Sequence, residues 1–136
     1  MSEMDKKLFE AAKKARENAH VPYSNFAVGA AILAENGKIY VGCNVENAAY
    51  PEGNCAETIA IGAMVLDRQL KIKKIYIVGN GKNPVVPCGG CRQRISEFGV
   101  ADTIVISHGI DGEPMKQNFA ELLPYSFSSS HLEAKE

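Results

Sequence analysis

The chain has 136 residues, a formal net charge of -1, 46% hydrophobic residues and 23% charged residues. This length suits one domain that buries a core without disulfide staples, and the composition and near-neutral charge argue against a disordered chain and against a nucleic-acid partner. No apolar run reaches the roughly 18 residues of a membrane span, and the polar N-terminus does not resemble a signal peptide, so we expect a cytoplasmic protein without membrane contact.

The N-terminal part of the chain predicts a helix followed by a β-hairpin. Apolar residues at helical spacing favour an amphipathic helix within residues 3–19. Pro22 should end this helix, because proline disfavours a helical conformation in the residue before it. Residues 26–33 and 38–43 are β-prone runs, and Asn36-Gly37 between them is a strong hairpin signal.

The rest of the chain alternates helices and strands. A polar loop over 44–54 leads into a helix over 55–70 that is apolar on most sides, so we expect it at the centre of the fold. The pattern then predicts, in order, a strand at 74–79, a helix at 88–98, a strand at 103–107, a turn at Asp111-Gly112 and a short helix at 118–123. This alternation favours an α/β layered sandwich. Residues 1–136 should form a single domain, with 128–136 as a polar, loosely held tail.

Three cysteines and a glutamate form the pattern that carries chemistry. Cys88 and Cys91 have C-x-x-C spacing at the start of a predicted helix, so one turn can hold a metal, and Cys55 begins another helix. Three thiolates with an open fourth position are typical of catalytic zinc, because structural zinc sites fill all four positions with protein. Zinc lowers the pKa of bound water to about 7, and Glu57 is placed to take and return its proton.

A zinc site with three thiolates has an electrostatic difficulty, because the cluster keeps one negative charge in excess. Both ligand segments begin predicted helices, whose N-terminal amides can donate to the sulfurs. Arg92, directly after Cys91, is a further candidate to stabilise the ligands as a nearby cation. Cys43 stands apart in a predicted strand, where a small buried hydrophobe is the simpler interpretation.

Together these motifs resemble the small cytidine deaminase family. The resemblance runs from about residue 11 to residue 127 and rests on blocks at 21–30, 42–50, 54–57, 87–93 and 122–124. Three cysteine ligands with a nonligand Glu are a recognised signature of zinc deaminases. The resemblance implies a three-layer α/β/α sandwich with a mixed, about five-stranded central sheet and one zinc ion per chain. It also implies hydrolytic deamination of cytidine and deoxycytidine to uridine and deoxyuridine, with release of ammonia, in pyrimidine salvage.

The same resemblance implies how the nucleoside is bound. Phe26 would stack on the pyrimidine ring, and Asn44 and Glu46 would hydrogen-bond the ribose, chiefly its 3′-hydroxyl. An amide and a carboxylate can both read a sugar edge, whereas turn formation by Asn44 and surface charge at Glu46 are the alternative interpretation. The pattern leaves the order of preference between cytidine and deoxycytidine open.

The resemblance further implies the chemistry and the assembly. The backbone of Ala56 and the side chain of Glu57 would read the base edge. Water activated at the metal would attack C4, and Glu57 would protonate N3 and then the leaving ammonia. Small members of the family form homotetramers with sites at subunit contacts, and Phe127 would reach into a neighbouring subunit's site.

One position departs from the pattern of the family. Many members with three cysteine ligands carry Arg directly after the catalytic Glu, where it helps to neutralise the thiolates, whereas this chain has Thr58. Arg94 lies three residues beyond Cys91, a spacing that shares a helix face. We therefore hypothesise that Arg94 supplies the missing cation; a solvent-facing Arg is the alternative.

Three other functions compete with this interpretation. Deaminases of cytosine nucleoside antibiotics such as blasticidin S share both cysteine motifs and also lack the Arg, although the blocks around Phe26 and Asn44 favour a nucleoside enzyme. A polynucleotide-editing deaminase must hold a strand with cations, and a clamped 3′-hydroxyl leaves no room for a continuing chain. A non-catalytic zinc module predicts a fourth protein ligand and no need for Glu57.

Overall fold

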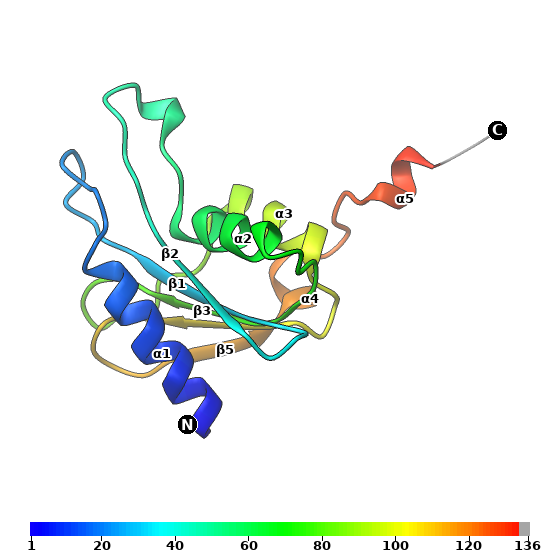
Figure 1. Cartoon of the computed structure of the whole chain (residues 1–136), viewed down its shortest axis with the longest axis horizontal. Coiled ribbons are helices and arrows are strands. Elements are labelled where there is room, and N and C mark those ends of the chain that lie inside the picture. The colour runs from blue at the N-terminus through cyan, green and yellow to red at the C-terminus, as the bar shows by residue number, and fades with distance from the viewer. Residues whose placement is uncertain (134–136) are drawn as a thin grey trace.

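The computed structural model describes residues 1–133 and is built on a five-stranded sheet in the order β2-β1-β3-β4-β5 (Figure 1). Its strands are β1 (Gly29–Ala34), β2 (Ile39–Cys43), β3 (Ile72–Val78), β4 (Ile104–His108) and β5 (Met115–Asn118). The β3–β4 pair is parallel and the other pairs are antiparallel, so the sheet is mixed, as expected. All six residues of β1 are buried, which is typical of a strand covered on both faces.

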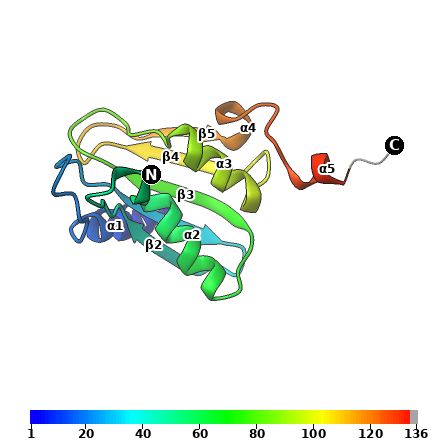
Figure 2. The ribbon, with the colours of Figure 1, turned by 90° about the horizontal axis from the view of Figure 1, so that it is seen from above.

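Helices cover both faces of this sheet and make three layers (Figures 1 and 2). The longer helices are α1 (Glu3–Arg16), α2 (Ala56–Leu66) and α3 (Gly89–Phe98), and short turns form η1 (Tyr50–Glu52), α4 (Phe119–Leu122) and α5 (Ser129–Leu132). α1 lies on one face, and α2 and α3 lie side by side on the other (Figure 2). The predicted α/β/α sandwich is confirmed. No helix of residues 1–133 is long and apolar enough to cross a membrane.

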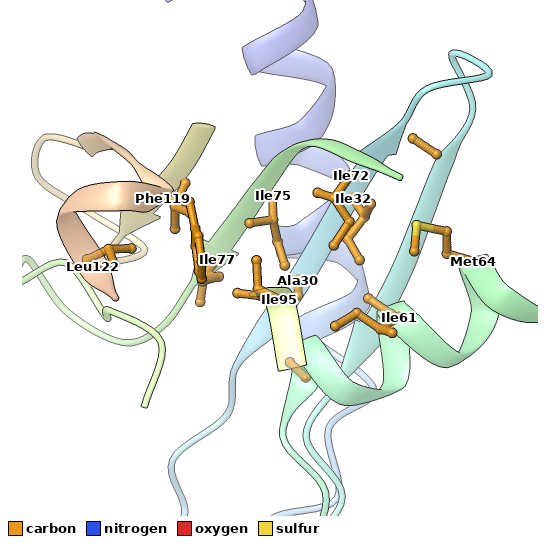
Figure 3. Close-up of a cluster of buried hydrophobic side chains, with 14 of the residues drawn as sticks. Ala30, Ile32, Ile61, Met64, Ile72, Ile75, Ile77, Ile95, Phe119 and Leu122 are labelled. Carbon is orange, nitrogen blue, oxygen red and sulfur yellow. The ribbon is translucent and has the colours of Figure 1, made fainter. Parts of the chain in front are cut away.

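Alternate residues of the strands pack into two separate cores. On the α2–α3 face, Ile32, Ile75 and Ile77 pack with Met64 of α2 and Ile95 of α3 (Figure 3). Leu8 and Ala12 of α1 contact the opposite face, beside Ala31, Leu33, Tyr76, Val78 and Ile106. Burying one such aliphatic side chain contributes about 1.5–3 kcal/mol, so these two cores set where each helix lies.

Gly42 of β2 determines how closely α2 approaches the sheet. A Cβ at this position would lie 2.4 Å from the Ala60 nitrogen and 2.5 Å from the Ala56 carbonyl oxygen. Both atoms are helix backbone and cannot rotate away. Glycine at residue 42 therefore lets the first turns of α2 rest directly on the strand, which positions the residues at the start of that helix.

The structure differs from the sequence-based predictions in three places. The prediction of α2 at the centre is wrong for the single chain, because α2 lies in an outer layer with Leu66 87% exposed. β5 was not predicted from the pattern of the chain, since Met115-Lys116-Gln117-Asn118 is polar and pairs only at the sheet edge. Within the predicted tail, Ser129–Leu132 form one exposed helical turn, and residues 134–136 lie outside the described residues.

Candidate active site

Three cysteine sulfurs meet where α2 and α3 begin. Cys55 and Cys88 are the N-cap residues of α2 and α3, and Cys91 lies one turn into α3. The three sulfurs lie within 4.8 Å of one another. Zinc–sulfur bonds of about 2.3 Å in a tetrahedron place the sulfurs about 3.8 Å apart, so a small closure suffices to bind the ion. Within residues 1–133 no fourth metal-binding side chain joins this cluster, and Cys43 lies apart from it in β2.

The three cysteine side chains influence one another's protonation. A hydrogen bond from the Cys91 thiol holds the pKa of Cys55 below its usual range, despite partial burial of the sulfur. The same hydrogen bond, together with burial, raises the pKa of Cys91. Cys91 is fully buried, whereas Cys88 is exposed. The Cys91 sulfur is therefore the position at which a negative charge is least solvated and needs a partner most.

Glu57 is the acidic residue beside this cluster. Its side chain is held in the first turn of α2, and only 4% of its surface is exposed. Burial raises the pKa of Glu57, the negative charge of Cys55 raises it further, and hydrogen bonds and the charge of Arg94 oppose this only in part. A buried carboxyl group with a raised pKa beside a metal site is the kind of group that exchanges protons.

A cavity of about 140 Å³ joins these groups to the predicted sugar-binding segment. Its lining comprises Val28, Asn44, Cys55, Ala56, Glu57, Val85, Val86 and Cys88. Ala56 is the first residue of α2, whose backbone N–H has no partner within the helix and is free for a ligand. Sequence reasoning did not select the three valines, because an apolar wall carries no chemical signature in a single sequence.

Asn44 lies on this cavity and also shapes it. Its side-chain oxygen accepts a hydrogen bond from the Val28 N–H at 2.9 Å, and its Nδ2 donates to the Phe26 carbonyl at 2.8 Å. A primary amide has two N–H donors and two lone pairs on oxygen. One donor and one lone pair of Asn44 therefore stay free for a sugar hydroxyl, while the others hold the 26–28 segment in place.

Glu46 lies at a second cavity, of about 330 Å³, which Glu46 and Asn47 line together with Tyr23, Ser24, Tyr50 and Gly53. One carboxylate oxygen accepts hydrogen bonds from the Tyr23 and Ser24 N–H groups at 3.0 and 3.1 Å. Hydrogen bonding with Ser24 holds the pKa of Glu46 below its usual value. Glu46 is therefore ionised at neutral pH, and its second oxygen can accept a hydrogen bond from a hydroxyl group.

The two aromatic residues predicted to contact the nucleoside, Phe26 and Phe127, do not line the cavities of the described chain. Phe26 has 42% of its surface exposed, and in the described part of the chain it lines neither cavity. The segment between α4 and α5, to which Phe127 belongs, leaves the body of the fold (Figures 1 and 2). The Phe127 carbonyl accepts a hydrogen bond from Gln93, and its exposed ring stacks on His131 with centroids 5.2 Å apart.

The two arginines of α3 have different surroundings. Arg92 donates to the carbonyl oxygens of Pro87 and Leu122, both at 2.9 Å, and so ties the start of α3 to the end of α4. The Nη1 of Arg94 lies 3.8 Å from the sulfur of Cys91. Thr58 follows Glu57, and its buried hydroxyl has no hydrogen-bond partner among residues 1–133. The structure thus brings Arg94, and not Arg92, to the cysteine cluster.

Comparisons with known proteins agree with this geometry. A family model for the cytidine and deoxycytidylate deaminase zinc-binding region matches residues 2–107. The cytidine deaminase of Sporosarcina psychrophila is 47% identical over 126 residues, which is 93% of each chain. That of Halalkalibacterium halodurans is 40% identical over 125 residues, 92% of this chain and 95% of the relative. The crystal structure of the Burkholderia pseudomallei cytidine deaminase matches with a TM-score of 0.86 and 40% identity, over 93% of this chain and 100% of the other.

Proposed function

Because this chain belongs to the cytidine and deoxycytidylate deaminase zinc-binding family, we propose that it hydrolyses the 4-amino group of cytidine and deoxycytidine. The products are uridine or deoxyuridine and ammonia. One observation carries the proposal: a buried Glu57 lines the same cavity as Cys55 and Cys88, and the Cys91 sulfur lies within 4.8 Å of both of their sulfurs. This arrangement suits the activation of water next to a flat base.

The residues of this chain divide the reaction between them. Cys55, Cys88 and Cys91 would hold a zinc ion, which when bound supplies a Lewis acid that makes a water molecule acidic near neutral pH. Glu57 takes one proton of the attacking water and gives it to N3 of the base. It then takes the second proton from the oxygen added at C4 and delivers it to the amino group, so the C4 carbonyl forms as ammonia leaves. The place of Glu57 in the first turn of α2 holds the carboxyl group at the cavity, within reach of both the water and the base.

The sugar and the base are held by segments that precede α2 and by the first residue of that helix. The free hydrogen-bonding positions of Asn44 and the second oxygen of Glu46 bind ribose hydroxyls. The unpaired N–H at Ala56 contacts the base edge. Phe26 would stack on the ring, since Asn44, which lines the cavity, holds the Phe26 carbonyl by a hydrogen bond.

A homotetramer with sites at subunit contacts accounts for the apolar surface that the single chain leaves bare. α2 exposes Val65 and Leu66 on the side that does not contact the sheet, and a helix apolar on most sides is normally covered. Phe127 is exposed and lines neither cavity within residues 1–133, so it can serve a neighbouring one. Light scattering of the purified chain should give a mass of four subunits, and Leu66→Lys should reduce it.

The candidate substrates differ in the sugar groups that they offer to Asn44 and Glu46 for hydrogen bonding. Blasticidin S offers a cytosine but a different sugar edge, and a polynucleotide has no free 3′-hydroxyl. We therefore expect conversion of cytidine and deoxycytidine to exceed that of blasticidin S and of a cytosine oligonucleotide. Comparable conversion of either competitor would contradict the proposed nucleoside specificity. A cytoplasmic location and a role in pyrimidine salvage stay predictions.

The test is an ultraviolet assay of the zinc-loaded protein with these four substrates, with Glu57→Gln as the matched control. The parent should convert cytidine to uridine, and the variant should keep its zinc while losing turnover. A zinc-loaded parent that converts none of the four substrates would overturn the proposal. Equal conversion by parent and variant would remove Glu57 from the reaction.

A further inference from the structure

The cysteine cluster has one negative charge more than a bound zinc ion neutralises, and the position of that charge can be read from burial. Cys88 is exposed and Cys55 half-buried, so water solvates their sulfurs in part. Cys91 is fully buried. A buried charge is costly unless a cation or hydrogen-bond donors compensate it. A bound metal would therefore be influenced most by whatever lies next to the Cys91 sulfur.

Arg94 supplies the cation at that sulfur. Its Nη1 lies 3.8 Å from the Cys91 sulfur, within the range of an N–H···S hydrogen bond. Arg92, the other arginine of α3, uses its guanidinium on the carbonyls of Pro87 and Leu122. Thr58 does not compensate the charge of the sulfur either, since its hydroxyl has no hydrogen-bond partner in the described chain.

Gly90 provides the space that the Arg94 guanidinium occupies. A Cβ at residue 90 would lie 3.1 Å from the Nη1 of Arg94, closer than an ordinary van der Waals contact. Residues 90 and 94 are four apart on α3, so the two positions share one helix face. Gly89 has no such constraint, because nothing lies within 4 Å of a Cβ there. The two adjacent glycines thus have different roles.

We propose that Arg94 and Gly90 act as a pair that sets the charge of this zinc site: Arg94 balances the Cys91 thiolate, and Gly90 leaves room for its guanidinium. This inference rests on the proposed zinc chemistry of the same cluster. Positive charge at the thiolate reduces the electron density that the sulfur donates to the metal, so the metal remains a strong acid. Arg94 acts through Cys91 and does not need to contact the substrate.

The test replaces zinc by cobalt(II) and measures the thiolate-to-cobalt charge-transfer absorption. Arg94→Gln should move this absorption to lower energy, because loss of the cation raises the energy of the sulfur electrons. Arg94→Lys should recover part of the shift. Gly90→Ala should shift it in the same direction but by less, since the guanidinium can move aside, and Gly89→Ala is the matched control that should not shift it. Gln and Lys are good helix formers, so α3 should persist in both variants.

Turnover gives the second readout. Arg94→Gln should lower kcat by about 10- to 100-fold with a smaller change in KM, because the substrate-binding residues are untouched. An absorption band in Arg94→Gln at the same energy as in the parent would overturn the inference, whatever the activity. A parent that binds cobalt but deaminates no nucleoside would instead overturn the proposed function. The two failures are therefore distinguishable in one set of proteins.

Discussion

Glu57 and Asp5 are buried carboxylates on opposite faces of the sheet, with 4% and 2% of their surface exposed. Asp5 of α1 accepts hydrogen bonds from Lys74 and Lys116 at 2.8 and 2.9 Å. Burial alone would raise the pKa of Asp5, but the two lysines outweigh it and hold that pKa below its usual value. Glu57 has no such pair, and burial raises its pKa. A paired buried carboxylate stabilises the fold, whereas one left with a raised pKa is available for proton transfer.

The largest expected effect is a loss of turnover when Glu57, but not Asp5, is replaced by its amide. Glu57→Gln should lower cytidine turnover by about 10²- to 10⁴-fold, because the group that moves the proton is lost. Its free energy of unfolding should stay the same or rise, since a neutral amide avoids burying a charge. Steady-state kinetics and urea unfolding of the zinc-loaded proteins measure both. A strong loss of stability in Glu57→Gln would contradict the assignment of Glu57 as a functional rather than a structural group.

Asp5→Asn should show the reverse behaviour. The amide keeps the shape of the side chain but leaves Lys74 and Lys116 without a counter-ion. We expect the free energy of unfolding to fall by about 1–2 kcal/mol, a moderate loss because both lysines are partly exposed. Turnover per folded molecule should not change. Urea unfolding with the cytidine assay checks this, and a large loss of turnover would link the α1 face to the active site.

The pH dependence of stability sharpens the same contrast. Because the folded-state pKa of Asp5 is lower than its usual value of 3.8, this carboxylate stabilises the fold above that pH. The contribution is lost as pH falls through the folded-state pKa. The stability difference between parent and Asp5→Asn should therefore be constant from pH 7 to about 5 and shrink below about 4. A difference that grows on acidification would contradict the lowered pKa.

The smallest effect concerns Tyr76, which lies beside Asp5. Its hydroxyl is 2.8 Å from the Nδ1 of His108, and the Nε2 of that ring lies 3.1 Å from the Gly112 carbonyl oxygen. A carbonyl only accepts, so Nε2 carries the proton and Tyr76 donates to Nδ1. Burial raises the pKa of Tyr76 to about 12, which keeps the donor protonated. Tyr76→Phe should cost about 1 kcal/mol in thermal unfolding and leave turnover unchanged.

Local sequence predicted the parts of the molecule that short-range geometry controls. Asn36-Gly37 forms the hairpin turn, with Gly37 at a φ of 85°, and the Cys55 and Cys88 segments do begin helices. The C-x-x-C spacing and the position of Glu57 were readable because they lie within one helical turn. The cysteines that the structure groups, and the glutamate that we propose as proton carrier, could therefore be named without knowledge of the fold.

Features that depend on contacts between distant segments of the chain were decided only by the tertiary structure. The contact between α2 and β2 through Gly42, the edge pairing of β5 and the exposed outer face of α2 all follow from how apolar faces are buried. The sequence offered both Arg92 and Arg94 as cations for the cysteine cluster, and only the contacts of each side chain distinguished them. Spacing along one helix specifies which residues share a face, but the surroundings of that face come from packing against the rest of the chain.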